Sequence, residues 1–127
     1  MDDQTKIIEQ IEDKLFKEGF YKTTMDDVAS ELGMSKKTIY KFFPSKEDLV
    51  LAIAKHFMNR MKSKILPALN SDKNAVEKLS ELIKILAGAS EKISNKRMEE
   101  MKRHFPGIWN EIDSFRTKMM FENITKI

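Results

Sequence analysis

The chain has 127 residues, of which 41% are hydrophobic and 34% charged, and its formal net charge is +3, as in globular proteins rich in helix. It contains no cysteine, which excludes disulfides, thiolate metal sites and cysteine nucleophiles. It has no apolar run of about 18 residues and no secretion signal at its acidic start, so a cytoplasmic protein without membrane contact is expected.

Four glycines and three prolines are few breakers for this length, and they predict an all-α fold. The first helix is expected over residues 5–18, where apolar residues recur at helical spacing. Gly19 follows it in the position of a C-cap glycine. Phe20, in the connection after it, is interpreted as a core residue.

Two short capped helices come next. Thr24 is expected to cap the second helix, with Asp27 completing a capping box. Gly33 breaks that helix, and Ser35 caps a third helix over residues 36–43. Such a pair of helices around a glycine turn predicts a helix-turn-helix motif.

Longer helices are expected in the rest of the chain, from residue 46 to Pro67, over 72–93 and 95–104, and from 108 to the end after a break at 105–107. Apolar residues predicted to face inward on the helix over 72–93 are Val76, Leu79, Leu82, Ile83 and Leu86, and Ile124 is an apolar position of the last helix. We expect a DNA-binding domain over residues 1–48 and a partial helical regulatory domain over 49–127.

Positive charge gathers locally on the third helix. The first 62 residues carry 11 basic and 11 acidic residues, yet no acid falls between Met34 and Lys46. The second helix of such a motif lies in the major groove, where lysine and threonine can contact base edges. Lys46 and Thr24 begin their helices, where free backbone amides favour a phosphate. The candidate DNA-binding residues are Thr24, Ser35, Lys36, Lys37, Thr38, Tyr40, Lys41 and Lys46.

Residues 5 to about 55 resemble the DNA-binding domain of the TetR family of bacterial transcriptional regulators. The residues that carry the resemblance are Gly19-Phe20, Thr23-Thr24, Asp27-Val28-Ala29, Gly33-Met34-Ser35, Thr38-Ile39-Tyr40, Phe43, Lys46 and Leu49. The resemblance implies a ligand-responsive repressor that binds a palindromic double-stranded operator as a homodimer.

The resemblance also implies particular roles for single residues. Thr24, Tyr40 and Lys46 match phosphate contacts of the family, whereas Lys36, Lys37, Thr38 and Lys41 lie where the family varies its base contacts. This chain has Lys37 where members often have glycine, and Phe42 where they often have histidine. Members usually extend well beyond 127 residues, so the helices that complete their ligand pocket and dimer interface are expected to be missing.

A small hydrophobic effector is the expected ligand of the second domain. Methionine and aromatic side chains suit adaptable ligand sites, and the candidates are Met98, Met101, Phe105, Trp109 and Met119. Ordinary core packing and an exposed apolar surface remain alternatives for these residues.

Other chemistry has little support in the sequence. His56 and His104 lack metal-ligand spacing, so no metal or other cofactor is expected. Adjacent acids at 26–27 and 99–100 diverge on a helix and are interpreted as cap and surface charges rather than a catalytic pair. The expected protein is therefore not an enzyme, and the alternative to a regulator is a helical protein–protein interaction module that has lost operator binding.

Overall fold

The computed structural model describes residues 2–123, which form seven helices and no strand, so the all-α prediction is confirmed. The helices are α1 (Asp3–Glu18), α2 (Met25–Leu32), α3 (Lys36–Phe42), α4 (Lys46–Leu69), α5 (Ala75–Lys92), α6 (Asn95–His104) and α7 (Pro106–Asn123). None of these helices is long and apolar enough to cross a bilayer. Ile124, an expected apolar position of the last helix, lies outside the described residues.

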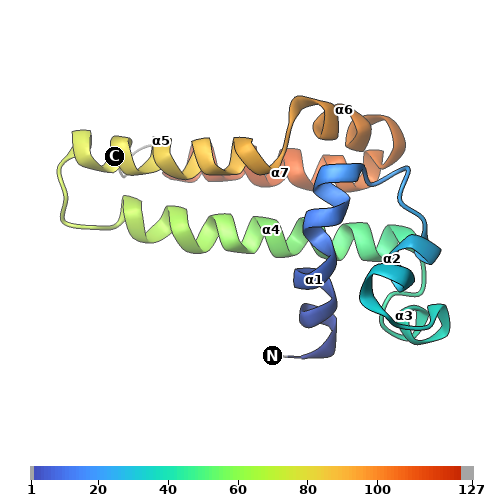
Figure 1. The fold of residues 1–127 in the computed structure, drawn as a ribbon. Coiled ribbons are helices and arrows are strands. Elements are labelled where there is room, and N and C mark those ends of the chain that lie inside the picture. The colour runs from blue at the N-terminus through green and yellow to red at the C-terminus, as the bar shows by residue number, and fades with distance from the viewer. Residues whose placement is uncertain (1, 124–127) are drawn as a thin grey trace.

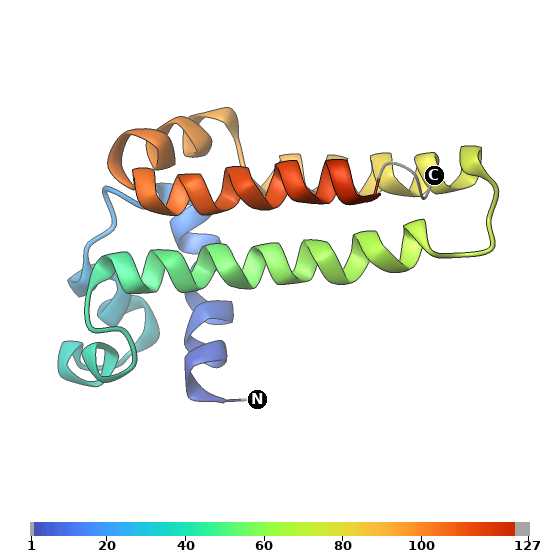
Figure 2. The same ribbon diagram turned by 180° about the vertical axis from the view of Figure 1, so that it is seen from behind.

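The helix α4 organises the molecule. The helix α1 crosses it steeply, and α2 and α3 lie near its amino-terminal end (Figure 1). Seen from behind, α7 runs alongside α4, and α5 returns antiparallel to α4 (Figure 2). The short helix α6 packs on α7 near the carboxyl end of α1. The helix α4 thus packs against both the amino-terminal helix α1 and the carboxyl-terminal helices α5 and α7.

Side-chain caps fix where the short helices begin. Thr24 and Asp27 form the expected capping box, with the Asp27 N–H 3.1 Å from Thr24 Oγ1 and the Thr24 N–H 2.9 Å from Asp27 Oδ2. The Ser35 hydroxyl accepts the Thr38 N–H at 3.1 Å. Gly33 ends α2 with a φ of +64°, a left-handed conformation that favours glycine. The predicted caps at Thr24 and Ser35 and the predicted turn at Gly33 are confirmed.

A hydrophobic core joins the first four helices to α6 and α7. Ile11, Ile39 and Ile53 are fully buried at its centre, and Phe20 is buried as predicted. The contribution of the later helices to this core is Met101, Phe105 and Ile108. The expected domain boundary at residue 48 lies in the first turn of α4, and the core extends across it.

The prediction that α5 buries its apolar face is wrong. Leu82 is half-buried, but Val76, Leu79, Ile83 and Leu86 are 47–78% exposed, and α5 has no buried residue. The helix packs mainly against α4, and its outer face remains exposed. Helical spacing reports amphipathicity, but burial needs a second packing partner.

Three helix ends also differ from expectation. The helix α5 begins at Ala75 rather than near 72, because the Asn74 side chain caps it by accepting the Glu77 N–H at 2.9 Å. The helix α4 continues past Pro67 for two residues. Pro106 is the first residue of α7, where a helix needs no N–H donor, so the expected break at 105–107 is a corner between α6 and α7.

Candidate nucleic-acid interface

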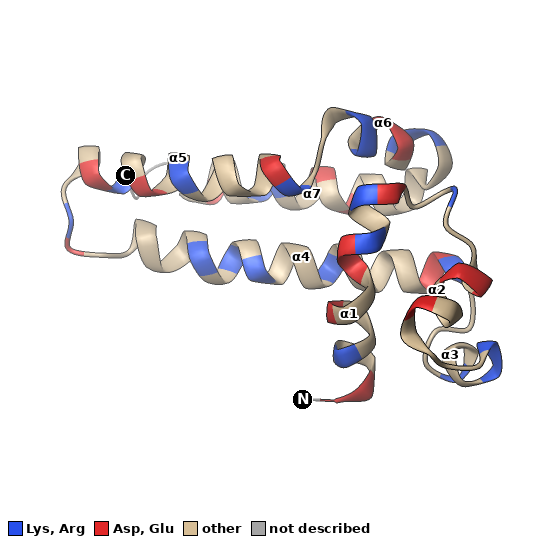
Figure 3. Cartoon of the chain, in the orientation of Figure 1, with Lys and Arg blue, Asp and Glu red and all other residues tan. Residues whose placement is uncertain are grey.

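Basic residues gather on α3, whereas the first turn of α4 combines Lys46 with two acids, Glu47 and Asp48 (Figure 3). Ile39 and Phe43 are buried and anchor α3 to the core. This packing leaves Lys37 and Lys41 exposed, and neither forms an ion pair with any residue in the range 2–123. These two ammonium groups are therefore available to an anionic partner.

Lys36 has an internal partner instead. Its Nζ lies 3.1 Å from Asp26 Oδ1 on α2, and this hydrogen bond raises the pKa of Lys36. The pair is exposed to solvent, where a phosphate or base can compete for the ammonium. The structure thus links Lys36 to α2 and leaves the other two lysines of α3 unpaired within the described chain.

The small hydroxyl residues at the start of α3 have a structural role. The hydroxyl groups of Ser35 and Thr38 lie 2.9 Å apart, in addition to the cap bond from the Thr38 N–H. Thr24 caps α2 in the same way, and its backbone and side-chain hydrogen bonds lower the pKa of Asp27. Tyr40 is 40% exposed near the end of α3. The candidate DNA-binding residues therefore lie on α3 or at the first turns of α2 and α4.

Lys46 is half-buried and takes part in an interaction that the sequence did not predict. Its Nζ donates to the backbone carbonyl of Tyr21 at 2.6 Å and lies 5.7 Å from the centre of the Tyr21 ring. Burial lowers the pKa of Lys46, although Glu100 and Asp27 act in the opposite direction. This lysine is less exposed than the lysines of α3.

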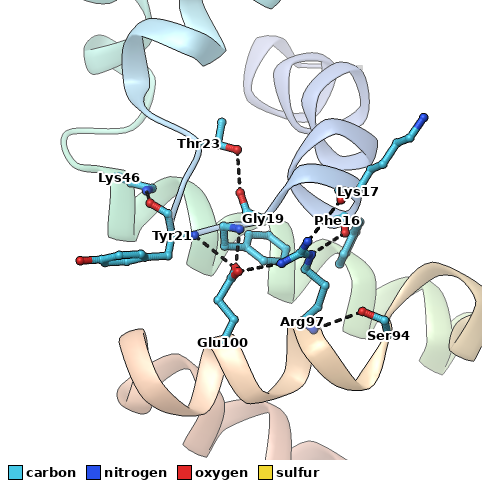
Figure 4. A network of polar contacts seen from close by, with 10 residues as sticks. Phe16, Lys17, Gly19, Tyr21, Thr23, Lys46, Ser94, Arg97 and Glu100 are labelled. Carbon is cyan, nitrogen blue, oxygen red and sulfur yellow. Dashed lines mark hydrogen bonds and ion pairs between the residues drawn. The ribbon is translucent and has the colours of Figure 1, made fainter.

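Helix α6 fixes the connection between α1 and α2 (Figure 4). Glu100 Oε1 accepts the N–H groups of Phe20, at 2.5 Å, and Tyr21, at 3.2 Å. Its other oxygen pairs with Arg97 Nη1 at 2.7 Å. The interpretation of Glu100 as a surface charge is wrong, because this side chain is largely buried and joins segments 80 residues apart. Glu99, its neighbour, is exposed as expected.

Arg97 closes the carboxyl end of α1. Its Nε donates to the carbonyl of Phe16 at 2.8 Å, and its Nη2 donates to the carbonyl of Lys17 at 3.3 Å. Gly19 turns beside this side chain with a φ of +118°. A Cβ there would lie 3.1 Å from both Arg97 Nη1 and Glu100 Oε2, so glycine satisfies both the backbone angle and the close approach.

A second buried carboxylate links α1 to α4 and α5. Glu12 is 4% exposed and accepts two hydrogen bonds from Arg60, at 2.7 and 2.8 Å, and one from Lys92 at 3.0 Å. Sequence reasoning missed this cluster. Its only signal was an acid between Ile11 and Leu15, on the apolar face of the first helix.

A cavity of about 460 Å³ lies among α4, α5, α6 and α7. It includes four of the five predicted ligand-binding residues, Met98, Met101, Trp109 and Met119. Phe105 is buried in the core and is not among its lining residues. Arg97 also borders the cavity, so α6 contacts both this space and the connection between α1 and α2.

The two histidines pack separately. His56 is half-buried, with Nε2 3.5 Å from Glu9 Oε1, and the His104 ring stacks on Tyr21 with centroids 3.7 Å apart. Residues 2–123 hold no group of three or more histidine, aspartate or glutamate side chains placed for a metal ion.

Comparisons with known proteins agree with this geometry. Residues 7–53 match the model of the bacterial regulatory proteins of the tetR family. The chain is 30% identical over 103 residues to YvaF, an uncharacterised HTH-type transcriptional regulator of Bacillus subtilis, covering 80% of this chain and 54% of YvaF. It is 43% identical over 51 residues to YerO, another such regulator of that organism, covering 37% of this chain and 18% of YerO.

The structure is similar to that of the ketosteroid transcriptional regulator KstR2 of Mycobacterium tuberculosis, with a TM-score of 0.78. The match covers 98% of this chain and 66% of KstR2 at 18% identity, which supports the shared fold alone. The chain spans about half the length of YvaF and less of YerO.

Proposed function

We propose that this chain is a member of the TetR family, a sequence-specific DNA-binding transcriptional regulator that acts as a ligand-responsive repressor. The observation that carries the proposal is the exposed lysine face of α3, on the second helix of a capped helix-turn-helix. Such a helix fits the major groove with its amino-terminal residues toward base edges. A bacterial cytoplasm is the proposed location, because an operator is found there.

The residues divide into two kinds of DNA contact. The residues that face the bases are Lys36, Lys37, Thr38 and Lys41, with Ser35 at the edge of the helix. Thr24, Tyr40 and Lys46 face the phosphates, and these contacts fix the position of the protein without reading sequence. Lysine on guanine acceptors and threonine on thymine methyl groups supply the specificity.

Two copies of the chain bind one palindromic operator in this proposal. Each copy places α3 in one of two successive major grooves, which the DNA repeat separates by about 34 Å. A homodimer is required because one helix-turn-helix reads only one half-site.

The cavity among α4–α7 is the proposed site of a small hydrophobic effector. Its volume suits a small molecule, and the methionines and Trp109 give it an adaptable apolar lining. Because α4 borders the cavity and also begins beside α3, a ligand that tilts α4 would change the spacing of the two recognition helices. The ligand then lowers operator affinity by favouring the wrong spacing.

A protein–protein interaction module is the second candidate function. The observation that favours it is the exposed apolar face of α5, with Val76 and Ile83 the most exposed residues. In that case the lysines of α3 would contribute nothing to DNA affinity.

Selection from a random duplex pool, with the molar mass of the bound complex, tests the proposal. We expect a palindromic consensus bound by a dimer. Lys37→Ala and Lys41→Ala should change site preference or cost about 1–3 kcal/mol, whereas Lys46→Ala should weaken binding to all sequences about equally. Failure of all three substitutions to change DNA affinity would overturn the regulator in favour of the interaction module.

A further inference from the structure

Tyr21 lies where the DNA-binding residues meet helix α6. Its N–H donates to Glu100 at 3.2 Å, and its ring stacks on His104 with the two ring planes 11° apart. Its carbonyl accepts a hydrogen bond from Lys46 at 2.6 Å (Figure 4). One residue thus contacts two side chains of α6 and the first residue of α4.

Lys46 retains capacity for a second partner in this arrangement. An ammonium group has three N–H donors, and the Tyr21 carbonyl takes one of them. The remaining two can bind a phosphate. A long lysine side chain loses rotamer freedom when it binds, so an ammonium already held in place loses less on binding DNA.

We propose that Tyr21 is a positioning residue for DNA binding, whose carbonyl orders the Lys46 ammonium while Glu100 and His104 of α6 hold Tyr21 in place. The proposal rests on the proposed function, in which Lys46 contacts a DNA phosphate. It assigns DNA affinity to two residues of α6 that lie outside the helix-turn-helix.

Through the same contacts, helix α6 connects the cavity to the residues proposed to bind DNA. Met98, Met101 and Arg97 of α6 line the cavity, and Arg97 is paired with Glu100 at 2.7 Å. A displacement of α6 would therefore disturb Glu100 and then the hold on Tyr21. Lys46 would lose its fixed position, and DNA affinity would fall.

A double-mutant cycle tests this connection. A short duplex of arbitrary sequence is titrated at low salt into four proteins: the unmutated chain, Lys46→Ala, Glu100→Ala and the double variant. An arbitrary sequence suffices because a phosphate contact does not depend on sequence. Glu100→Ala should lower affinity roughly two- to tenfold when Lys46 is present and have little effect when it is alanine. Glu99→Ala is the matched control, because Glu99 is the exposed neighbour on α6 and pairs only with Lys102 among the described residues.

The outcomes separate the inference from the function. If the unmutated chain binds no duplex, the proposed function fails. If it binds but Lys46→Ala has no effect, or Glu100→Ala weakens binding equally in both backgrounds, the positioning role of Tyr21 is overturned. Should Glu100→Ala unfold the chain, which circular dichroism would reveal, His104→Leu makes the same test by removing only the ring stacked on Tyr21.

Discussion

The amino-terminal half of α4 and the helix α5 both present an apolar stripe, and their environments differ completely. Leu49, Val50 and Ile53 of α4 are at most 1% exposed, because α1 and its neighbours pack on them. On α5, Ile83 remains 58% exposed. The comparison shows that the helix-turn-helix region is ordered by packing, whereas α5 has a partner on one side only.

The largest contrast should appear in two isoleucine truncations. Ile53→Ala removes a fully buried side chain and should lower the free energy of unfolding by about 2–5 kcal/mol. Ile83→Ala, on the exposed face of α5, should change it by about 0.5 kcal/mol or less. Chemical denaturation of both variants measures the difference, and equal losses would mean that a partner covers α5 in solution.

Two cations of α6, buried Arg97 and exposed Lys102, extend the comparison between buried and exposed positions. Arg97→Leu removes the side-chain donor to the carbonyl of Phe16 and the cation paired with Glu100, and should destabilise the fold by about 1–3 kcal/mol. Lys102→Leu removes an exposed ion pair with Glu99 and should lose at most about 1 kcal/mol. Thermal unfolding distinguishes them, and equal effects would contradict a structural role for Arg97.

Two glycines should respond with opposite signs. Gly33→Ala places a side chain in a left-handed conformation and should destabilise the turn by about 1–2 kcal/mol. Gly88→Ala, inside α5 with open space around its Cβ, should stabilise the protein by about 0.4–1 kcal/mol. Denaturation midpoints report both, and stabilisation by Gly33→Ala would show that the turn differs from the one described.

The smallest effect concerns acid sensitivity of the helix caps. The pKa of Asp27 is lowered below its ordinary value of 3.8, so its stabilising effect is present above that pH and lost as pH falls through the lowered pKa. Asp27→Asn should therefore reduce the melting temperature at neutral pH and make little difference in strong acid. Asn74→Ser, at the uncharged cap of α5, should give a difference that does not vary with pH.

The sequence predicted the helix-turn-helix well because its signals are local. Thr24, Gly33 and Ser35 fix caps and a turn within a few residues, and each confirmed prediction depends on such a contact. The role of Glu100 could not be predicted, since its partners at 20 and 21 are 80 and 79 residues away. The exposure of α5 was missed for a related reason: helical spacing does not say whether a second partner is present.

Long-range bonds to α1 also constrain the order in which the chain can complete its fold during synthesis. The carboxyl end of α1 binds Arg97, and Glu12 binds Lys92, so these partners are translated about 80 residues after their acceptors. Glu12 can gain Arg60 once α4 has been synthesised, but Lys92 and Arg97 follow only with the end of α5 and with α6. The hydrogen bonds that hold the carboxyl end of α1 can therefore form only after α6 has been made.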